Sequence, residues 1–71
     1  MGISLRQLKY FAAVAELGRI SQAAIQLNIS QSAVTTAMRE LEDTLNQQLI
    51  ERHSHGVELT DAGRQIGRAH V

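Results

Sequence analysis

The feature that most constrains this chain of 71 residues is an apolar residue followed by a hydroxyl side chain, a pattern that recurs along its length. A Ser or Thr hydroxyl can accept a hydrogen bond from the free N–H groups of a helix's first turn. The apolar residue before it can pack against the fourth helical residue. The pattern predicts four helices, which start after Ile3 and Ser4, Ile20 and Ser21, Ile29 and Ser30, and Leu59 and Thr60.

The first two predicted helices are separated by a glycine. The first covers about residues 5–17, and Gly18 ends it because glycine tolerates the left-handed backbone of a C-terminal cap. Its apolar residues at helical spacing are expected to face the core, namely Leu8, Phe11, Ala12 and Ala15. The second helix covers about residues 22–27 after a cap at Ser21, and Asn28 suits the tight left-handed turn that follows.

The third predicted helix changes character along its length. It begins after Ser30, covers about residues 31–45 and has Asn46 as its end cap. Its inward stripe consists of Val34, Met38, Leu41 and Leu45. The first half of its outer face has short uncharged polar side chains, and the second half has acids, in the order Gln31, Ser32, Thr35, Thr36, Glu40, Glu42 and Asp43.

The segment after the third helix changes period. Short runs of alternating residues flank a turn-like centre at residues 53–56, so residues 49–59 are predicted to form a small β-hairpin. Thr60 then caps a fourth helix, and Asp61 is favourable near its positive end. No stop signal follows before Val71, so we expect the chain to end inside this helix, as a piece of something longer.

A short helix, a turn and a second helix with a polar outer face predict a helix-turn-helix. The outer row and its neighbours are Gln31, Ser32, Thr35, Thr36 and Arg39. Such side chains can bond to base edges, contact thymine methyl groups or reach phosphates, and none repels DNA. The positive end of the helix also favours a nearby phosphate. The alternative is an ordinary amphipathic helix whose polar face meets only water.

The bulk composition narrows the classes of function. Seven Lys and Arg against seven Asp and Glu give a net charge of zero, which argues against nucleic-acid binding unless the basic residues gather on one surface. The absence of cysteine excludes disulfides and thiolate metal sites and is compatible with a cytoplasmic protein. No apolar run approaches the roughly 20 residues that span a bilayer, so no membrane partner is expected.

The chain resembles the N-terminal DNA-binding domain of LysR-type transcriptional regulators, bacterial proteins that switch genes in response to small molecules. The stretches that carry the likeness are LRQLKYFAAVAELG, SQAAIQLNISQSAVT, then LE, L and ER, and finally LTDAG. The resemblance implies a mainly α, winged helix-turn-helix domain over residues 3–60, with the helix-turn-helix at about 20–39 and the wing at about 49–59. Residues 60–71 would begin a linker helix that pairs two subunits into a homodimer or higher oligomer. A small-molecule effector would bind a further C-terminal domain, and no cofactor is expected here.

The resemblance also implies roles for individual residues, with double-stranded DNA as the partner. Base-reading residues of the recognition helix, about 31–45, would be Gln31, Ser32, Thr35 and Thr36. Contacts to phosphate would come from Ser21, Ser30 and Arg52, and the nearby Arg39, His53 and His55 are expected to support them. Ser32 stands where the family commonly has Pro. Thr36 stands where Arg is frequent, so a possible contact to guanine is lost.

Two other functions compete with this one. His53 and His55, with Glu51 and Glu58 nearby, suggest a metal site, but two imidazoles are too few for a closed zinc site, so solvated or phosphate-contacting histidines remain the alternatives. No phosphate loop, nucleophile elbow or HExxH motif occurs, so no catalytic residue and no enzyme is expected. The rival is a helical protein-interaction or dimerisation module without DNA readout. Binding to DNA must weaken steeply with salt, whereas an apolar helix contact should barely respond.

Overall fold

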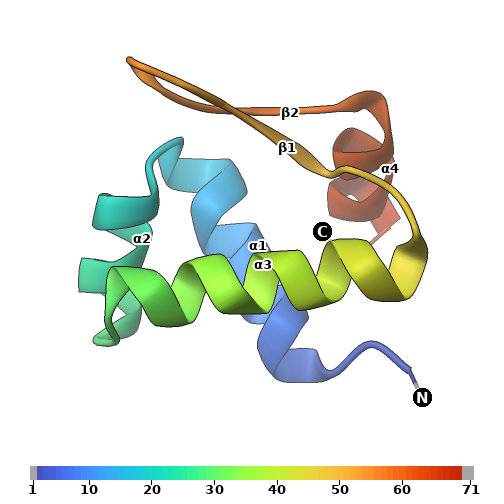
Figure 1. Ribbon diagram of the computed structural model, residues 1–71, viewed down its shortest axis with the longest axis horizontal. Coiled ribbons are helices and arrows are strands. Elements are labelled where there is room, and N and C mark those ends of the chain that lie inside the picture. Colours follow the sequence, from blue (N-terminus) through green and yellow to red (C-terminus); the bar gives the residue numbers. More distant parts are fainter. Residues whose placement is uncertain (1, 70–71) are drawn as a thin grey trace.

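The computed structural model describes residues 2–69 and contains four helices and one two-stranded antiparallel hairpin (Figure 1). In chain order the elements are α1 (Leu5–Leu17), α2 (Ile20–Leu27), α3 (Gln31–Leu45), β1 (Ile50–His53), β2 (Gly56–Leu59) and α4 (Asp61–Ala69). Helix α3 crosses the front of the molecule with α1 behind it, α2 lies beside its first half, and the hairpin extends above it (Figure 1). The predicted mainly α fold with a hairpin after the third helix is confirmed.

Side-chain caps start α1 and α3 where the sequence predicts them. Ser4 Oγ accepts a hydrogen bond from the Gln7 N–H at 3.1 Å, and Gln7 Oε1 accepts from the Ser4 N–H at 3.2 Å, which completes a capping box. Ser30 Oγ accepts from the Ala33 N–H at 3.1 Å. These two helix starts therefore follow from local hydrogen bonding alone.

The predicted start of α2 is wrong. The helix begins at Ile20, with Arg19 in extended conformation as its N-terminal cap and no side-chain cap hydrogen bond. The Ala23 N–H already donates to the Arg19 carbonyl at 3.0 Å, so Ser21 lies in the first helical turn and cannot cap it. The side chain of Ile25 is also 73 % exposed, so the expected packing of Ile20 on Ile25 is absent.

The core lies between α1, α2, α3 and the start of β1. Its buried residues are Phe11, Ala13, Val14, Ala23, Ala24, Val34, Ala37, Met38, Leu41, Leu49 and Ile50. The inward stripe predicted for α3 is confirmed, with Leu45 half-buried at its end. The prediction for α1 is partly wrong because Ala12 is exposed while Ala13 and Val14 are buried. Helix α1 packs on α2, α3 and β2 together, and this rotates its buried face away from Ala12.

The hairpin is anchored to the link between α1 and α2. Its register pairs Ile50 with Leu59 and His53 with Gly56, and two residues form the turn. The Val57 N–H donates to the Gly18 carbonyl at 2.7 Å. Gly56 has φ +142°, and a Cβ there would lie 2.6 Å from the same carbonyl oxygen, so only glycine fits this approach. Backbone contact therefore sets the position of the hairpin relative to α2.

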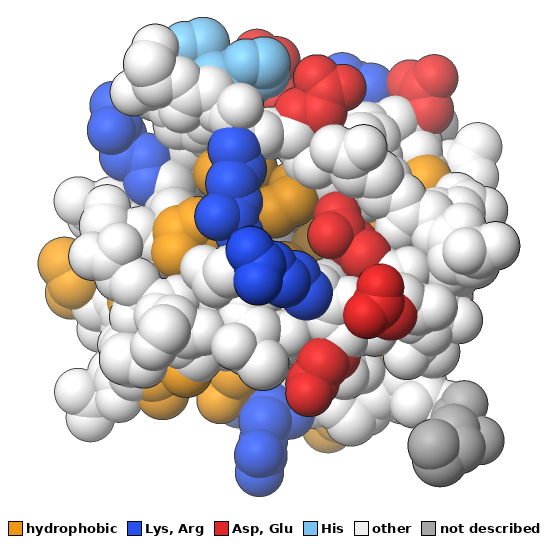
Figure 2. Space-filling view, viewed as in Figure 1, with side chains coloured by type: hydrophobic (Ala, Val, Ile, Leu, Met, Phe, Trp, Pro, Cys, Tyr) orange, Lys and Arg blue, Asp and Glu red, His pale blue; other side chains and the backbone are white. Residues whose placement is uncertain are grey.

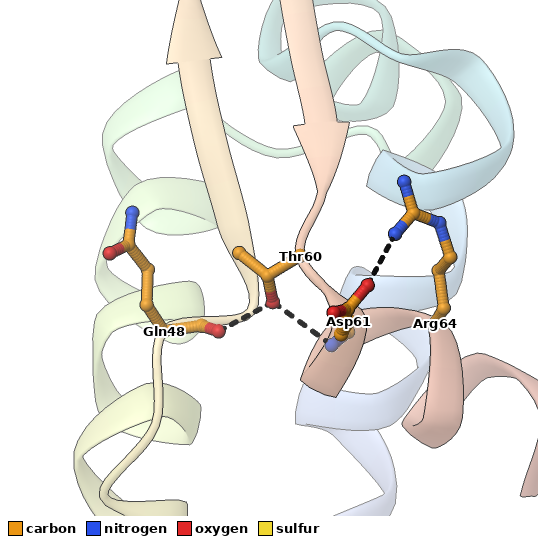
Figure 3. A network of polar contacts seen from close by, with 5 residues as sticks. Gln48, Thr60, Asp61 and Arg64 are labelled. Atoms are coloured by element: carbon orange, nitrogen blue, oxygen red, sulfur yellow. Dashed lines mark hydrogen bonds and ion pairs between the residues drawn. The ribbon is translucent and has the colours of Figure 1, made fainter.

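Thr60 joins the end of the hairpin to α4. Its hydroxyl accepts a hydrogen bond from the Gly63 N–H at 3.1 Å and donates to the Gln48 carbonyl at 2.6 Å, as Figure 3 shows. The Thr60 N–H donates to the Leu49 carbonyl at 3.0 Å. The predicted cap at Thr60 is confirmed, and it also fastens α4 to the segment before β1. Helix α4 reaches Ala69, so the expectation about Val71 lies outside the described residues.

Glu42, an acidic residue of α3, has a structural role. Its Oε2 atom accepts hydrogen bonds from the Leu49 N–H at 2.7 Å and the Ile50 N–H at 3.2 Å. Leu49 and Ile50 are buried, so these backbone donors would otherwise lie away from water. The carboxylate therefore ties the second half of α3 to the start of the hairpin.

Within residues 2–69, no helix combines the length and the hydropathy that crossing a membrane requires.

Candidate nucleic-acid interface

The turn between α2 and α3 is short and tightly bonded. Asn28 adopts φ 60° and ψ 43°, a left-handed conformation that asparagine tolerates. The Ile29 N–H donates to the Ala24 carbonyl at 3.0 Å, and the half-buried Ile29 packs against the core. Ala23 and Ala24 are small and buried, so α2 lies close to its neighbours. This turn fixes the direction in which α3 leaves it.

The exposed face of α3 spreads over about half of the helix circumference. Successive residues of an α-helix are about 100° apart, because it has 3.6 residues per turn. Going around the helix from the hairpin side, this places the polar side chains in the order Gln31, Thr35, Arg39, Ser32, Thr36 and Glu40. All of them are exposed except Thr35, which is half-buried. The predicted base-reading residues therefore share one face, with Gln31 at one edge and Thr36 near the other.

An open cleft of about 210 Å³ lies on the hairpin side of α3. This wing cleft is lined by residues of α2, α3 and the hairpin, among them Arg19, Ser21, Gln31, Arg52, His53 and Ser54. Four of the predicted site residues, from three separate segments of the chain, thus meet at one place. Arg19 and Arg52 are both exposed there, which makes the cleft positively charged. The contacts of Gly56 and Val57 with Gly18 hold its two walls together.

A second groove, of about 350 Å³, lies on the other side of α3, against α1. This α1 groove is lined by Arg6 and Tyr10 of α1, by the cap residue Ser30, and by Ser32, Thr36 and Glu40 of α3. Sequence analysis missed Arg6 and Tyr10, and their only local signal was a basic and an aromatic side chain four residues apart on α1. The predicted base-reading residues are therefore divided, with Gln31 beside the wing cleft and Ser32 and Thr36 beside the α1 groove.

The hydroxyls at the start of α3 are coupled to each other. Ser30 Oγ lies 3.1 Å from Ser32 Oγ while it also accepts the Ala33 N–H. A hydroxyl has one donor and two acceptor positions, so Ser30 keeps capacity for one more partner and Ser32 for two. The expected phosphate contact from Ser30 must therefore share this hydroxyl with the helix cap.

Charges separate along this face of the molecule. Figure 2 shows Lys and Arg side chains in the centre of this face, on its left and at its lower edge, and acidic side chains in a line to the right of the central ones. The uneven distribution overrides the zero net charge as an argument about partners. Glu40 lines the α1 groove together with Ser32 and Thr36 and does not line the wing cleft, so the acids lie away from Gln31 but not from Ser32 and Thr36.

The two histidines of the hairpin stack on each other. Their ring centroids are 5.2 Å apart with an interplanar angle of 8°. His53 Nε2 lies 3.2 Å from Glu58 Oε1 and 3.8 Å from Glu51 Oε1. Of the two, only His53 lines the wing cleft. Among the described residues, no group of three or more His, Cys, Asp or Glu is arranged to hold a metal ion.

Helix α2, the tight turn, the polar-faced α3 and the hairpin beyond it form a winged helix-turn-helix. The family model of "Bacterial regulatory helix-turn-helix protein, lysR family" matches residues 5–64. The chain belongs to this family, which confirms the resemblance.

Three similar proteins illustrate the relationship. The HTH-type transcriptional regulator TcbR of Pseudomonas sp. (strain P51) is 49% identical over 61 residues, which cover 86% of this chain and 21% of that protein. A crystal structure of the CbnR DNA-binding domain in complex with DNA has TM-score 0.90 and 45% identity, covering 93% of this chain and 76% of that one. The structure of Corynebacterium glutamicum OxyR, as the H2O2-bound C206S mutant, has TM-score 0.93 and 36% identity. The match covers 97% of this chain and 21% of that one. The chain thus spans about a fifth of the length of the curated relatives that it matches.

Proposed function

We propose that this chain binds double-stranded DNA in a sequence-specific manner, as the N-terminal domain of a bacterial transcriptional regulator. The observation that carries the proposal is the wing cleft, where Gln31, Ser21 and Arg52 converge from α3, α2 and the hairpin. An uncharged polar helix face beside exposed arginines fits the major groove, where base edges lie between two rows of phosphates. The DNA-bound structure of the CbnR domain supports it by likeness.

In this proposal the exposed face of α3 enters the major groove. The base-reading residues are Gln31, Ser32, Thr35 and Thr36. The amide of Gln31 can donate and accept together, which matches the major-groove edge of adenine. Arg52 and Arg39 supply positive charge to the DNA phosphates. Further contacts to the DNA backbone come from Ser21, Ser30, His53 and His55. Each of these side chains lies on the α3 face, at the start of α2, or on the hairpin.

The test of base reading is selection of preferred duplexes from random DNA by the chain and by Gln31→Ala. We expect the variant to lose preference at one base position, a discrimination of about 1–3 kcal/mol, and to keep its binding to random duplexes. Arg52→Ala is the matched comparison, because a phosphate contact carries no sequence information. It should keep the selected sequence, weaken all duplexes alike and lower the slope of log affinity against log salt by about 1.

Two results would contradict the proposal. One is an unchanged base preference in Gln31→Ala, because α3 would then not be placed as described. The other is an affinity that barely responds to salt, which would favour a protein-interaction module. Regulation, the effector and pairing of two subunits concern the intact protein, and we propose them from the family alone.

A further inference from the structure

The α1 groove is lined by an arginine, Arg6, to which the proposed function assigns no role. Arg6 lies in the first turn of α1, is exposed, and lines this groove beside Ser32 and Thr36 of α3. Within residues 2–69, none of the ion pairs involves Arg6. The guanidinium therefore stands next to the base-reading face with its donors available to an external acceptor.

The two flanks of α3 are occupied by different parts of the chain. The hairpin lies above α3 and the N-terminal part of α1 lies below it (Figure 1). Figure 2 shows basic side chains in the centre of this face and again at its lower edge, where α1 begins. Gln31 lines the wing cleft with Arg52, whereas Ser32 and Thr36 line the α1 groove with Arg6. An exposed arginine therefore stands on each side of the same helix.

This arrangement matches the dimensions of B-form DNA. The major groove is about 12 Å wide and is bordered by one phosphate strand on each side. An α-helix with its side chains is about 10–12 Å across, so a helix in the groove brings its two flanks to the two strands. Phosphate contacts on both strands fix the register of the helix, whereas contacts on one strand leave it free to roll.

We propose that Arg6 contacts a phosphate on the strand opposite to the one held by Arg52, so that α3 is held in the major groove from both sides. The inference rests on the proposed function and adds α1 to the DNA-binding surface. Glu40 lines the same groove and repels phosphate, and it lies two turns beyond Ser32 along α3. The contact of Arg6 therefore falls near Ser32, at the end of the groove away from that carboxylate.

The experiment uses this chain and a duplex that it has selected from random DNA. Arg6→Ala should weaken all sequences alike, keep the selected sequence and lower the salt slope by about 1, as Arg52→Ala does. Replacing single phosphates by neutral methylphosphonates then locates each contact. We expect Arg6→Ala and Arg52→Ala each to become insensitive to one neutralised phosphate, on opposite strands. Arg64→Ala is the charge-matched control, since Arg64 pairs with Asp61 on α4 and lines neither groove.

A second variant separates a phosphate contact from simple neutralisation of Glu40. If Arg6 only offset that carboxylate, Arg6→Ala would have no effect once Glu40→Gln is present. A phosphate contact predicts that the loss persists in the Glu40→Gln background and that Arg6→Lys restores the salt slope. An unchanged slope for Arg6→Ala beside a lowered slope for Arg52→Ala would overturn the two-sided contact and leave the proposed function standing. Absence of any salt-dependent DNA binding would overturn both.

Discussion

Gly63 and Gly67 occupy the same short helix in opposite surroundings. A Cβ at Gly63 would collide with the Leu49 carbonyl oxygen and would lie 3.4 Å from Leu59 Cδ2. A Cβ at Gly67, one turn later, would meet nothing within 4 Å. The glycine of the LTDAG stretch is therefore required by close packing of α4 on the segment before β1, whereas packing places no such demand on Gly67.

These surroundings predict opposite effects of the same substitution. Gly63→Ala should lower the free energy of unfolding by about 1–3 kcal/mol, because backbone atoms must move to admit the methyl group. Gly67→Ala should raise it by up to about 1 kcal/mol, because alanine favours the helix. Urea denaturation of both variants measures the difference. Stabilisation by both substitutions would show that α4 is not seated against Leu49.

At the scale of elements, the connection from α3 to the hairpin depends on Glu42. Glu42→Ala removes the acceptor for the Leu49 and Ile50 N–H groups, and leaving buried donors without a partner costs about 1–3 kcal/mol. We expect faster hydrogen exchange at those two amides and a lower free energy of unfolding. Asp43→Ala is the control, because this neighbouring acid is exposed. Equal effects of the two substitutions would contradict the structural role of Glu42.

The elements that could be predicted from the sequence are those set by local hydrogen bonds. Ser4, Ser30 and Thr60 cap their helices as expected, because a cap and its donor lie within three residues of each other. Ser21 misled the prediction because the backbone at Gly18 and Arg19 starts the helix two residues earlier, where the chain also meets the hairpin. That constraint comes from residues nearly forty positions away.

The candidate site shows the same limit. The polar face of α3 follows from helical spacing, so Gln31, Ser32 and Thr36 could be placed together from the sequence. The position of Arg6 beside that face depends on how α1 crosses α3, which no local pattern encodes. Glu42 was grouped with the other acids because its bonds to Leu49 and Ile50 are tertiary.

At the scale of the whole molecule, few basic residues are available to meet DNA. The chain has seven Lys and Arg, so a single copy can neutralise only a few phosphates and should bind weakly. Pairing of two copies through α4 would compensate, as the family resemblance implies. Ala62 and Ile66 of α4 pack partly against the core of their own chain, which leaves less of their apolar surface for a partner.

We therefore expect this form to bind one half-site poorly and to gain from an added dimerisation element. Fusing a two-stranded coiled coil in register after Val71 should tighten binding to a two-half-site duplex by at least about tenfold, because the second contact becomes intramolecular. A fused helix of equal length with polar residues at the pairing positions is the control. Titration of both fusions on duplexes with one and two half-sites tests this expectation. Equal affinities of both fusions for the two-site duplex would refute it.

The hydrogen bond from Val57 to the Gly18 carbonyl, beside the close approach of Gly56 to the same oxygen, joins the hairpin directly to the start of the helix-turn-helix. Little conformational entropy would then be lost on association, because the two contacting parts are already arranged relative to each other. The same connection would also fix the distance between the two contacts along the DNA. If Gln31 reads a base pair and Arg52 holds a phosphate, as proposed, the step between these two contacts is preset, and one inserted base pair would lengthen it by about 3.4 Å along the strand.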